Sequence, residues 1–148
     1  MATPQTIVIL DGAGRKVKVD AEHPFPVTSI PAAPLSSVTG TIVNAQSLSG
    51  AIDLRSVGTP VAIQTDAAWD TNTVTFQGSY DGVVYTNLRS MGTEIALPGV
   101  VASSMEAVDL HYFLGCRYLK VRSGTAAAPV AQVGNTTVTV ICGRIWTE

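Results

Sequence analysis

The side chains that could carry out chemistry are few and widely separated in this chain. The two histidines are His23, between Glu22 and Pro24, and His111, in an aromatic stretch with Tyr112. They form no metal-binding pair, and the sequence contains no nucleophile elbow and no glycine loop of the kind that cradles a phosphate. We therefore expect no catalytic, cofactor-binding or metal-binding residues, and we interpret His111 as a packed side chain.

The chain also contains two cysteines, Cys116 and Cys142, whose thiols could react. Neither belongs to a Cys-x-x-Cys pair or lies near a histidine at the spacing of a zinc site. One disulfide between them is arithmetically feasible. Two reduced, buried thiols are the interpretation that we favour.

Aromatic residues could instead bind a sugar. A carbohydrate-binding module needs exposed rings in a groove or loop cluster, with polar side chains between them. The candidates are Trp69, which is flanked by acidic residues, Tyr80 beside a turn, and Tyr112 in a loop. Trp69 has an alternative interpretation as a core residue, so Tyr80 is the better candidate for an exposed glycan contact.

The charge pattern argues against nucleic acid and membranes as partners. The formal net charge is -2 and the sequence pI is about 5.6, which does not favour binding to polyanions by bulk charge. Arg117, Lys120 and Arg122 share one predicted strand, but Arg117 and Lys120 have opposite parity. We interpret these three as solvated charges on an edge strand, where they deter unwanted pairing.

Length and composition indicate one folded domain. The chain has 148 residues, of which 46% are hydrophobic and 14% are charged, so it is too apolar for a disordered tail. It has no heptads and no run of about 18 apolar residues. The first five residues also lack the basic and apolar regions of a secretory signal. We expect a protein that is made in a cytoplasm and stays there or leaves inside something larger.

The first 37 residues differ from the rest. Residues 6–10 and 15–20 are β-prone and flank the turn-forming stretch 11–14, which predicts a small hairpin. Four of the eight prolines then fall between positions 24 and 34. Proline removes a backbone donor and favours extended conformations. We therefore predict an extended arm that lies along a surface of its own domain or of a neighbour, through the apolar side chains of Ile7, Ile9, Phe25, Val27 and Ile30.

Residues 38–148 are predicted to form an all-β domain, a β-sandwich of jelly-roll type. Short runs that alternate apolar and polar residues recur with turn signals roughly every ten residues. Val74, Phe76 and Gly78 should share one face of a strand. We expect no helix beyond one turn near residues 102–110. The predicted strands are 41–43, 52–55, 60–64, 73–79, 83–88, 94–97, 117–122 and 136–146.

One local pattern resembles a known fold family. Residues 76–88 form a strand, an Asp81-Gly82 turn and a second strand, and the run Arg117-Tyr118-Leu119-Lys120-Val121-Arg122 follows some thirty residues later. This pattern resembles the discoidin-like, galactose-binding β-sandwiches. The resemblance covers about fifty residues and implies a fold but no particular function, because this sandwich serves sugars, lipids, proteins and scaffolding.

A second resemblance covers most of residues 47–146. The segments 47–54, 67–69, 73–82, 115–125 and 129–132 are similar to a small protein family of tailed bacteriophages and prophages, often encoded among head-morphogenesis genes. The resemblance implies a non-enzymatic virion protein, a capsid decoration (cement) or head-fibre base protein that binds the major capsid protein or other virion proteins and its own copies as a homo-oligomer. The alternatives are a tail or head–tail component and a carbohydrate-binding adhesin module.

Overall fold

A computed structural model of the chain describes residues 9–10, 16–17 and 35–143. It divides the chain into two units, Met1–Ala32 and Ala33–Glu148. In the first unit, β1 (Ile9–Leu10) pairs antiparallel with β2 (Lys16–Val17), and Ile9 lies opposite Val17. This pairing agrees with the predicted hairpin.

The predicted arm falls almost wholly outside the described residues. Ile7, Phe25, Val27 and Ile30 all lie there, and Ile9 is described only by its backbone place in β1. The arm therefore stays a prediction.

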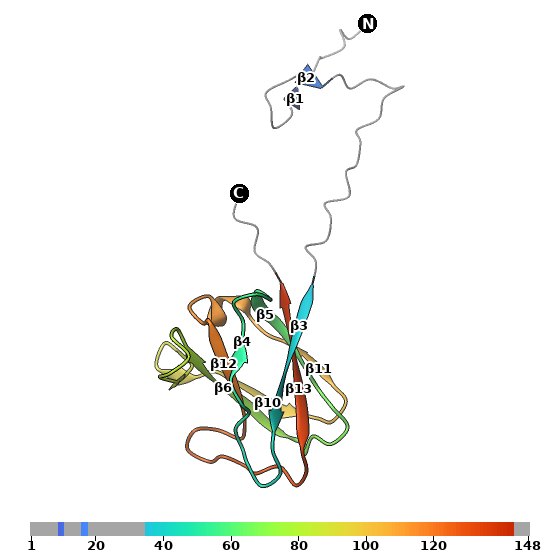
Figure 1. The fold of residues 1–148 in the computed structure, drawn as a ribbon, viewed down its shortest axis with the longest axis vertical. Helices are drawn as coiled ribbons and strands as arrows, with labels where there is room; N and C mark the ends of the chain where they lie inside the picture. Colours follow the sequence, from blue (N-terminus) through green and yellow to red (C-terminus); the bar gives the residue numbers. More distant parts are fainter. Residues whose placement is uncertain (1–8, 11–15, 18–34, 144–148) are drawn as a thin grey trace, which may run out of the picture. The chain divides into compact units, whose positions relative to one another are not determined.

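The second unit consists of two antiparallel β-sheets (Figure 1). The 4-stranded sheet has the order β11-β5-β13-β3, and the 5-stranded sheet has the order β10-β6-β12-β4, with β7 also paired to β6. The strands are β3 (Ser36–Ile42), β4 (Ile52–Asp53), β5 (Thr59–Thr65), β6 (Asn72–Ser79), β7 (Thr86–Asn87), β10 (Ala96–Val100), β11 (Met105–Ala107), β12 (Tyr118–Ser123) and β13 (Thr136–Gly143). A small hairpin of β8 (Arg89–Ser90) and β9 (Thr93–Glu94) lies between β7 and β10.

The pairing has the connectivity of a jelly roll. β3 pairs with β13, β4 with β12, β5 with β11 and β6 with β10, so the first half of the domain pairs with the second half in reverse order. This long hairpin then folds over so that β13 also pairs with β5 and β12 with β6. The prediction of an all-β, jelly-roll-type sandwich is confirmed.

Burial along the strands follows the period of two that the sequence predicted. Every second residue of β13 is buried from Thr136 to Cys142. In β6, Val74, Phe76 and Gly78 are buried as predicted, and Thr75 and Ser79 on the other face are buried as well. Alternation marks the strands because successive side chains point to opposite faces of a sheet.

Two local predictions were correct only in part. No described helix exceeds one turn, as expected, but the turn does not lie at 102–110, where β11 (Met105–Ala107) pairs with β5. The 3₁₀ helix η1 (Leu110–Phe113) follows, and the Asp109 side chain accepts from the backbone N–H of His111. Of the second strand predicted over residues 83–88, only β7 (Thr86–Asn87) pairs with β6. The loop before β7 is instead held by side-chain bonds.

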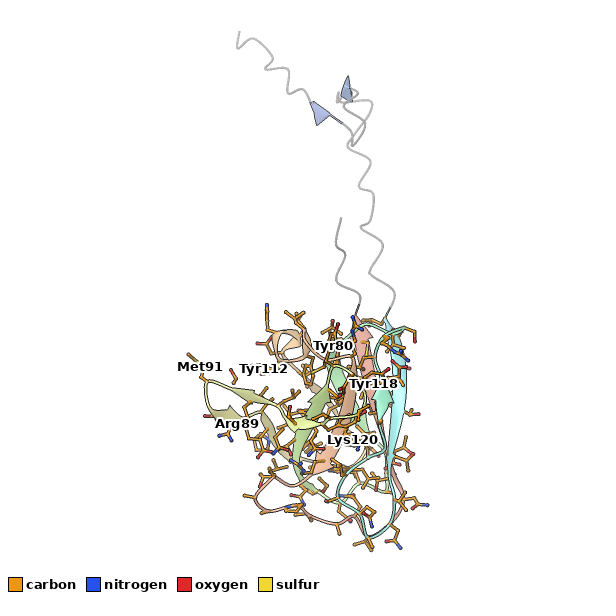
Figure 2. The ribbon with its side chains drawn as sticks, turned by 60° about the vertical axis from the view of Figure 1, so that its left-hand side comes forward. Tyr80, Arg89, Met91, Tyr112, Tyr118 and Lys120 are labelled. Carbon is orange, nitrogen blue, oxygen red and sulfur yellow. The ribbon has the colours of Figure 1, made fainter. Side chains whose placement is uncertain are left out.

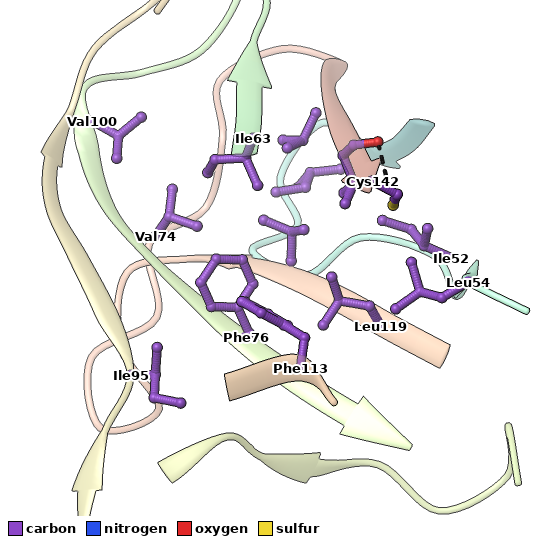
Figure 3. Close-up of a cluster of buried hydrophobic side chains, with 14 of the residues drawn as sticks. Ile52, Leu54, Ile63, Val74, Phe76, Ile95, Val100, Phe113, Leu119 and Cys142 are labelled. Atoms are coloured by element: carbon purple, nitrogen blue, oxygen red, sulfur yellow. Dashed lines mark hydrogen bonds between the residues drawn. The ribbon is translucent and has the colours of Figure 1, made fainter. Parts of the chain in front are cut away.

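The core lies between the two sheets (Figure 3). Phe76 and Phe113 are each at most 1% exposed, and their rings meet edge to face with centroids 5.2 Å apart. Fully burying a large apolar side chain stabilises a fold by about 1.5–3 kcal/mol. Cys142 is buried in the same cluster, Cys116 packs against it, and both thiols are free.

The basic residues of the β12 region are not edge-strand charges, so that interpretation was wrong. β12 is a central strand between β6 and β4. The Arg117 guanidinium lies 4.2 Å from the centroid of the Tyr80 ring, and the Lys120 ammonium lies 4.3 Å from that of Tyr85. Arg122 is 7% exposed. Residues 79–94 supply the tyrosine rings and the Glu94 carboxylate that contact these three cations. β12 itself has a paired strand on each side and is therefore not an edge.

Candidate interaction surfaces

The loop that follows β6 is built by a hydrogen-bonded turn. The Asp81 carboxylate accepts from the backbone N–H groups of Val83 and Val84 at 2.8 and 3.0 Å and from the Ser79 hydroxyl at 2.9 Å. These bonds to the charged form lower the pKa of Asp81 below its ordinary value. Gly82 has φ +79°, as the predicted Asp-Gly turn requires, and a Cβ there would meet the Tyr118 ring. The loop therefore has a defined shape.

This loop presents Tyr80 to solvent. The Tyr80 side chain is 66% exposed, and Arg117 covers one face of its ring. Trp69, in contrast, is 3% exposed, and its indole N–H donates to the carbonyl of Val100 at 3.0 Å. The proposed glycan contact at Trp69 is therefore wrong, because the ring is enclosed in the core, and the interpretation of Trp69 as a core residue is confirmed.

Tyr112 stands beside two shallow hollows. One, of about 260 Å³, is lined by Ser79, Tyr80, Thr86 and Tyr112, among others. The other, of about 390 Å³, is lined by residues that include Tyr112 and Met91. Figure 2 shows Met91 and Tyr112 on the left-hand side of the domain, with Tyr80 nearer its middle. We call the surface formed by Tyr80, Tyr112 and Met91 the tyrosine flank.

His111 lies beside the tyrosine flank and is not packed, contrary to the prediction. Its side chain is 75% exposed, and its Nδ1 lies 2.7 Å from Oδ1 of Asp109. Asp109 also accepts from the His111 backbone N–H, and these contacts lower the pKa of Asp109. Asp109 thus caps the N-terminus of η1.

A polar network fixes the segment that carries Met91 to the outer face of the 5-stranded sheet. Arg122 donates from Nη1 to Glu94 Oε1 at 3.1 Å and from Nη2 to Asn87 Oδ1 at 2.8 Å. The Glu94 carboxylate also accepts from the backbone N–H of Ala126 at 3.0 Å, and Gln77 donates to Asn87 at 3.2 Å. This outer face is therefore rich in charged and polar groups.

The outer face of the 4-stranded sheet, by contrast, is uncharged. In β3, the buried Gly40 and Ile42 point inward, so Ser37, Thr39 and Thr41 point outward. The residues of β13, β5 and β11 that lie on the same face follow from the pairing register of the four strands. None of the outward side chains is charged: Ser37, Thr39, Thr41, Thr137, Thr139, Ile141, Ala62, Gln64, Met105 and Ala107. We call this surface the neutral face.

The described residues hold no group of three or more His, Cys, Asp or Glu side chains that could bind a metal ion. The same part of the chain contains no helix with the length and apolar character needed to cross a membrane.

Sequence reasoning found Tyr80 and Tyr112 but missed the neutral face and Met91, which is fully exposed at 103% of its reference area. The face could have been found in part, since the parity of β3 and β13 already separates threonines from apolar residues. Its continuity across four strands depends on their spatial order, which no local pattern contains.

Comparison with known proteins adds no family. No family model matches the chain, and no curated protein matches it.

Proposed function

We propose that this chain is a non-enzymatic structural protein of a bacteriophage virion, which decorates or stabilises the capsid by binding the major capsid protein. The jelly roll supports this class without specifying it, because the fold serves both viral capsid proteins and lectins. The resemblance to a phage family that the sequence of residues 47–146 suggested is the expectation from which this proposal starts.

The observation that carries the proposal is the neutral face. Protein surfaces normally mix charges of both signs, whereas the centres of protein interfaces are depleted of charge. Covering Thr39, Thr139 and Ala62 with another protein removes no ion from water, so the desolvation cost is low. The opposite outer face, with Lys120, Arg122 and Glu94, would be far more costly to cover. One side of the domain is thus suited to docking and the other to solvent.

The neutral face can be tested by binding to purified particles that lack this protein. Thr139→Lys and Gln64→Lys each place a charge in the face, and Thr86→Lys places one on the exposed β7 of the other sheet as a control. We expect the first two to weaken cosedimentation with the particles at least tenfold and Thr86→Lys to leave it unchanged. Equal binding by all three variants, or no binding by the wild type, would refute the proposal.

The N-terminal segment is the second proposed attachment device. Deleting residues 1–34 leaves every strand of the second unit in place, because β3 begins at Ser36. We expect this deletion to abolish incorporation into particles while the sandwich still unfolds cooperatively. Unchanged incorporation would show that the arm does not attach the protein.

A carbohydrate-binding function is the second candidate, and the tyrosine flank favours it. Tyr80 and Tyr112 are 66% and 41% exposed, and they line one hollow with the hydroxyl-bearing Ser79 and Thr86. Aromatic faces with nearby hydroxyls are what sugar recognition needs. Binding on a glycan array that is lost in Tyr80→Ala and Tyr112→Ala would support this function. No binding by the intact protein to any glycan on the array would exclude this function.

A further inference from the structure

Three of the four sheet edges in the described part of the sandwich are short or interrupted. β4 pairs over two residues, and β11 has three residues and carries Glu106. β10 contains Pro98, and its register with β6 shifts between Leu97 and Val100. Such short strands, charges, prolines and bulges are the usual protection of edges against pairing with another chain.

The fourth edge, β3, has none of these features. It runs for seven residues from Ser36 to Ile42 and keeps an unbroken register with β13. Its sequence, Ser-Ser-Val-Thr-Gly-Thr-Ile, contains no charge and no proline. By the same physical argument, β3 is the edge at which another strand can add.

The backbone groups that point outward from β3 can be identified. The carbonyl of Thr41 accepts from the N–H of Gly50, so it points away from β13. Its partner Thr137 is likewise bonded on the far side of β13, through Asp66. In an antiparallel pair, alternate residues point their N–H and C=O the same way. The backbone groups of Ser37 and Thr39 therefore also point outward, and no described residue bonds to them.

The open part of the edge is bounded at one end by Gly50, whose N–H bonds to the Thr41 carbonyl. Ser37 and Thr39 lie on the open part, with Val38 between them. A strand that adds here can use the four outward backbone groups of Ser37 and Thr39.

We propose that two copies of this chain pair antiparallel through β3, with Val38 on the two-fold axis. In this register Ser37 of one copy lies opposite Thr39 of the second, and two such pairs exchange four backbone hydrogen bonds. In the same register Thr41 lies opposite Leu35 of the second copy, and the pairing ends there because Gly50 already occupies the Thr41 carbonyl. The two 4-stranded sheets become one continuous sheet, and their neutral faces join.

Charge and shape favour a second copy as the occupant. A symmetric pair places every residue near a copy of the same strand, so a charged strand would repel itself, and β3 has no charge. Val38 packs against the core but is only partly buried. Its copy across the axis would cover the remaining surface, since residues in such a non-hydrogen-bonded pair have close side chains.

The first test measures the mass of the full-length protein by analytical ultracentrifugation over a range of concentrations, without any virion component. Thr39→Pro removes an outward N–H but no bond to β13, so the domain should fold, as tryptophan fluorescence can verify. Thr39→Val keeps that N–H and is the matched control. We expect the wild type and Thr39→Val to form the same dimer and Thr39→Pro to weaken it at least tenfold.

Disulfide cross-linking tests the proposed register of the two paired β3 strands. Val38→Cys places two thiols at the axis, whereas Thr41→Cys places them six residues apart in the paired strands. We expect a covalent dimer on oxidation of Val38→Cys and none with Thr41→Cys or the wild type. A wild type that stays monomeric, a Thr39→Pro dimer as tight as the wild type, or equal cross-linking at position 41 would overturn the proposal. Each readout is independent of capsid binding, so failure of the pairing and failure of the proposed function remain distinguishable.

Discussion

Replacing Glu94 by alanine should destabilise the sandwich more than any other loss of a single charge in its described part. The Glu94 carboxylate accepts from Arg122 Nη1 at 3.1 Å and from the Ala126 N–H at 3.0 Å. The side chains of Arg122 and Glu94 are 8% and 21% exposed. Without Glu94, the bond to Asn87 at 2.8 Å is the one side-chain hydrogen bond that the buried guanidinium keeps among the described residues. The variant therefore leaves an uncompensated charge near the centre of the 5-stranded sheet.

The size of the effect follows from this burial. Breaking a buried ion pair by removing one partner costs about 3–5 kcal/mol. Glu94 is partly exposed and Asn87 remains, so we expect the lower end, about 3 kcal/mol, which corresponds to a fall in Tm of roughly 12 °C for a domain of this size. Arg122→Met should cost less, because water can reach the remaining carboxylate. The double variant Arg122→Met/Glu94→Leu should return to within about 1 kcal/mol of the wild type.

Urea unfolding followed by tryptophan fluorescence measures these changes, since Trp69 is 3% exposed and reports on the core. Arg55→Met is the control: Arg55 pairs with Asp53 at 2.6 Å, but the two side chains are 57% and 45% exposed, so the midpoint should not move. A loss below about 1 kcal/mol in Glu94→Ala, or a double variant as unstable as the sum of the singles, would refute the reasoning.

Four further outcomes are expected. Phe113→Ala should lower the free energy of unfolding, measured in urea, by about 3–5 kcal/mol, because it removes a core ring that is only 1% exposed and leaves a cavity. Phe113→Leu should lower it less. Gly124→Ala should lower Tm more than Gly99→Ala: both glycines have positive φ, but only a Cβ at position 124 meets backbone atoms, and equal losses would contradict this. Burial raises the pKa of Cys142 to about 11, so between about pH 9 and 11 unfolded thiols ionise while the folded thiol stays protonated. Stability should then fall with rising pH more steeply in the wild type than in Cys142→Ala. The carboxyl of Asp81 should titrate below 3.8 by NMR, owing to its bonds from Val83 and Val84, and a midpoint at or above 3.8 would show that these bonds are absent in solution.

The elements with clear alternation were predictable, because one buried face imposes a period of two. The predicted strands at 60–64, 73–79 and 117–122 correspond to β5, β6 and β12 with shifts of one residue at one or both ends. β11 was missed, since Met105–Ala107 has only three residues and pairs with a strand forty residues away. Its local sequence contains too few residues to reveal a period.

The candidate surfaces divide in the same way. The exposed Tyr80 was predictable because it sits beside an Asp-Gly turn, and turns lie on the surface. Trp69 was ambiguous, because flanking aspartates say nothing of where an indole ring points. The prediction wrongly put Arg117 and Lys120 on an edge strand, because an edge strand and a central strand can have the same sequence.

The sequence by itself determines that this protein is all-β, which residues of each strand share a face, and that reactive side chains are sparse, because these properties depend on neighbours along the chain. The tertiary structure alone decides that β12 is central, that β3 is an edge, and that threonines and alanines of four strands join into one neutral face. Strand order arises from pairings between residues up to about a hundred positions apart, such as Ser36 with Cys142, and no local pattern encodes which strands will become neighbours.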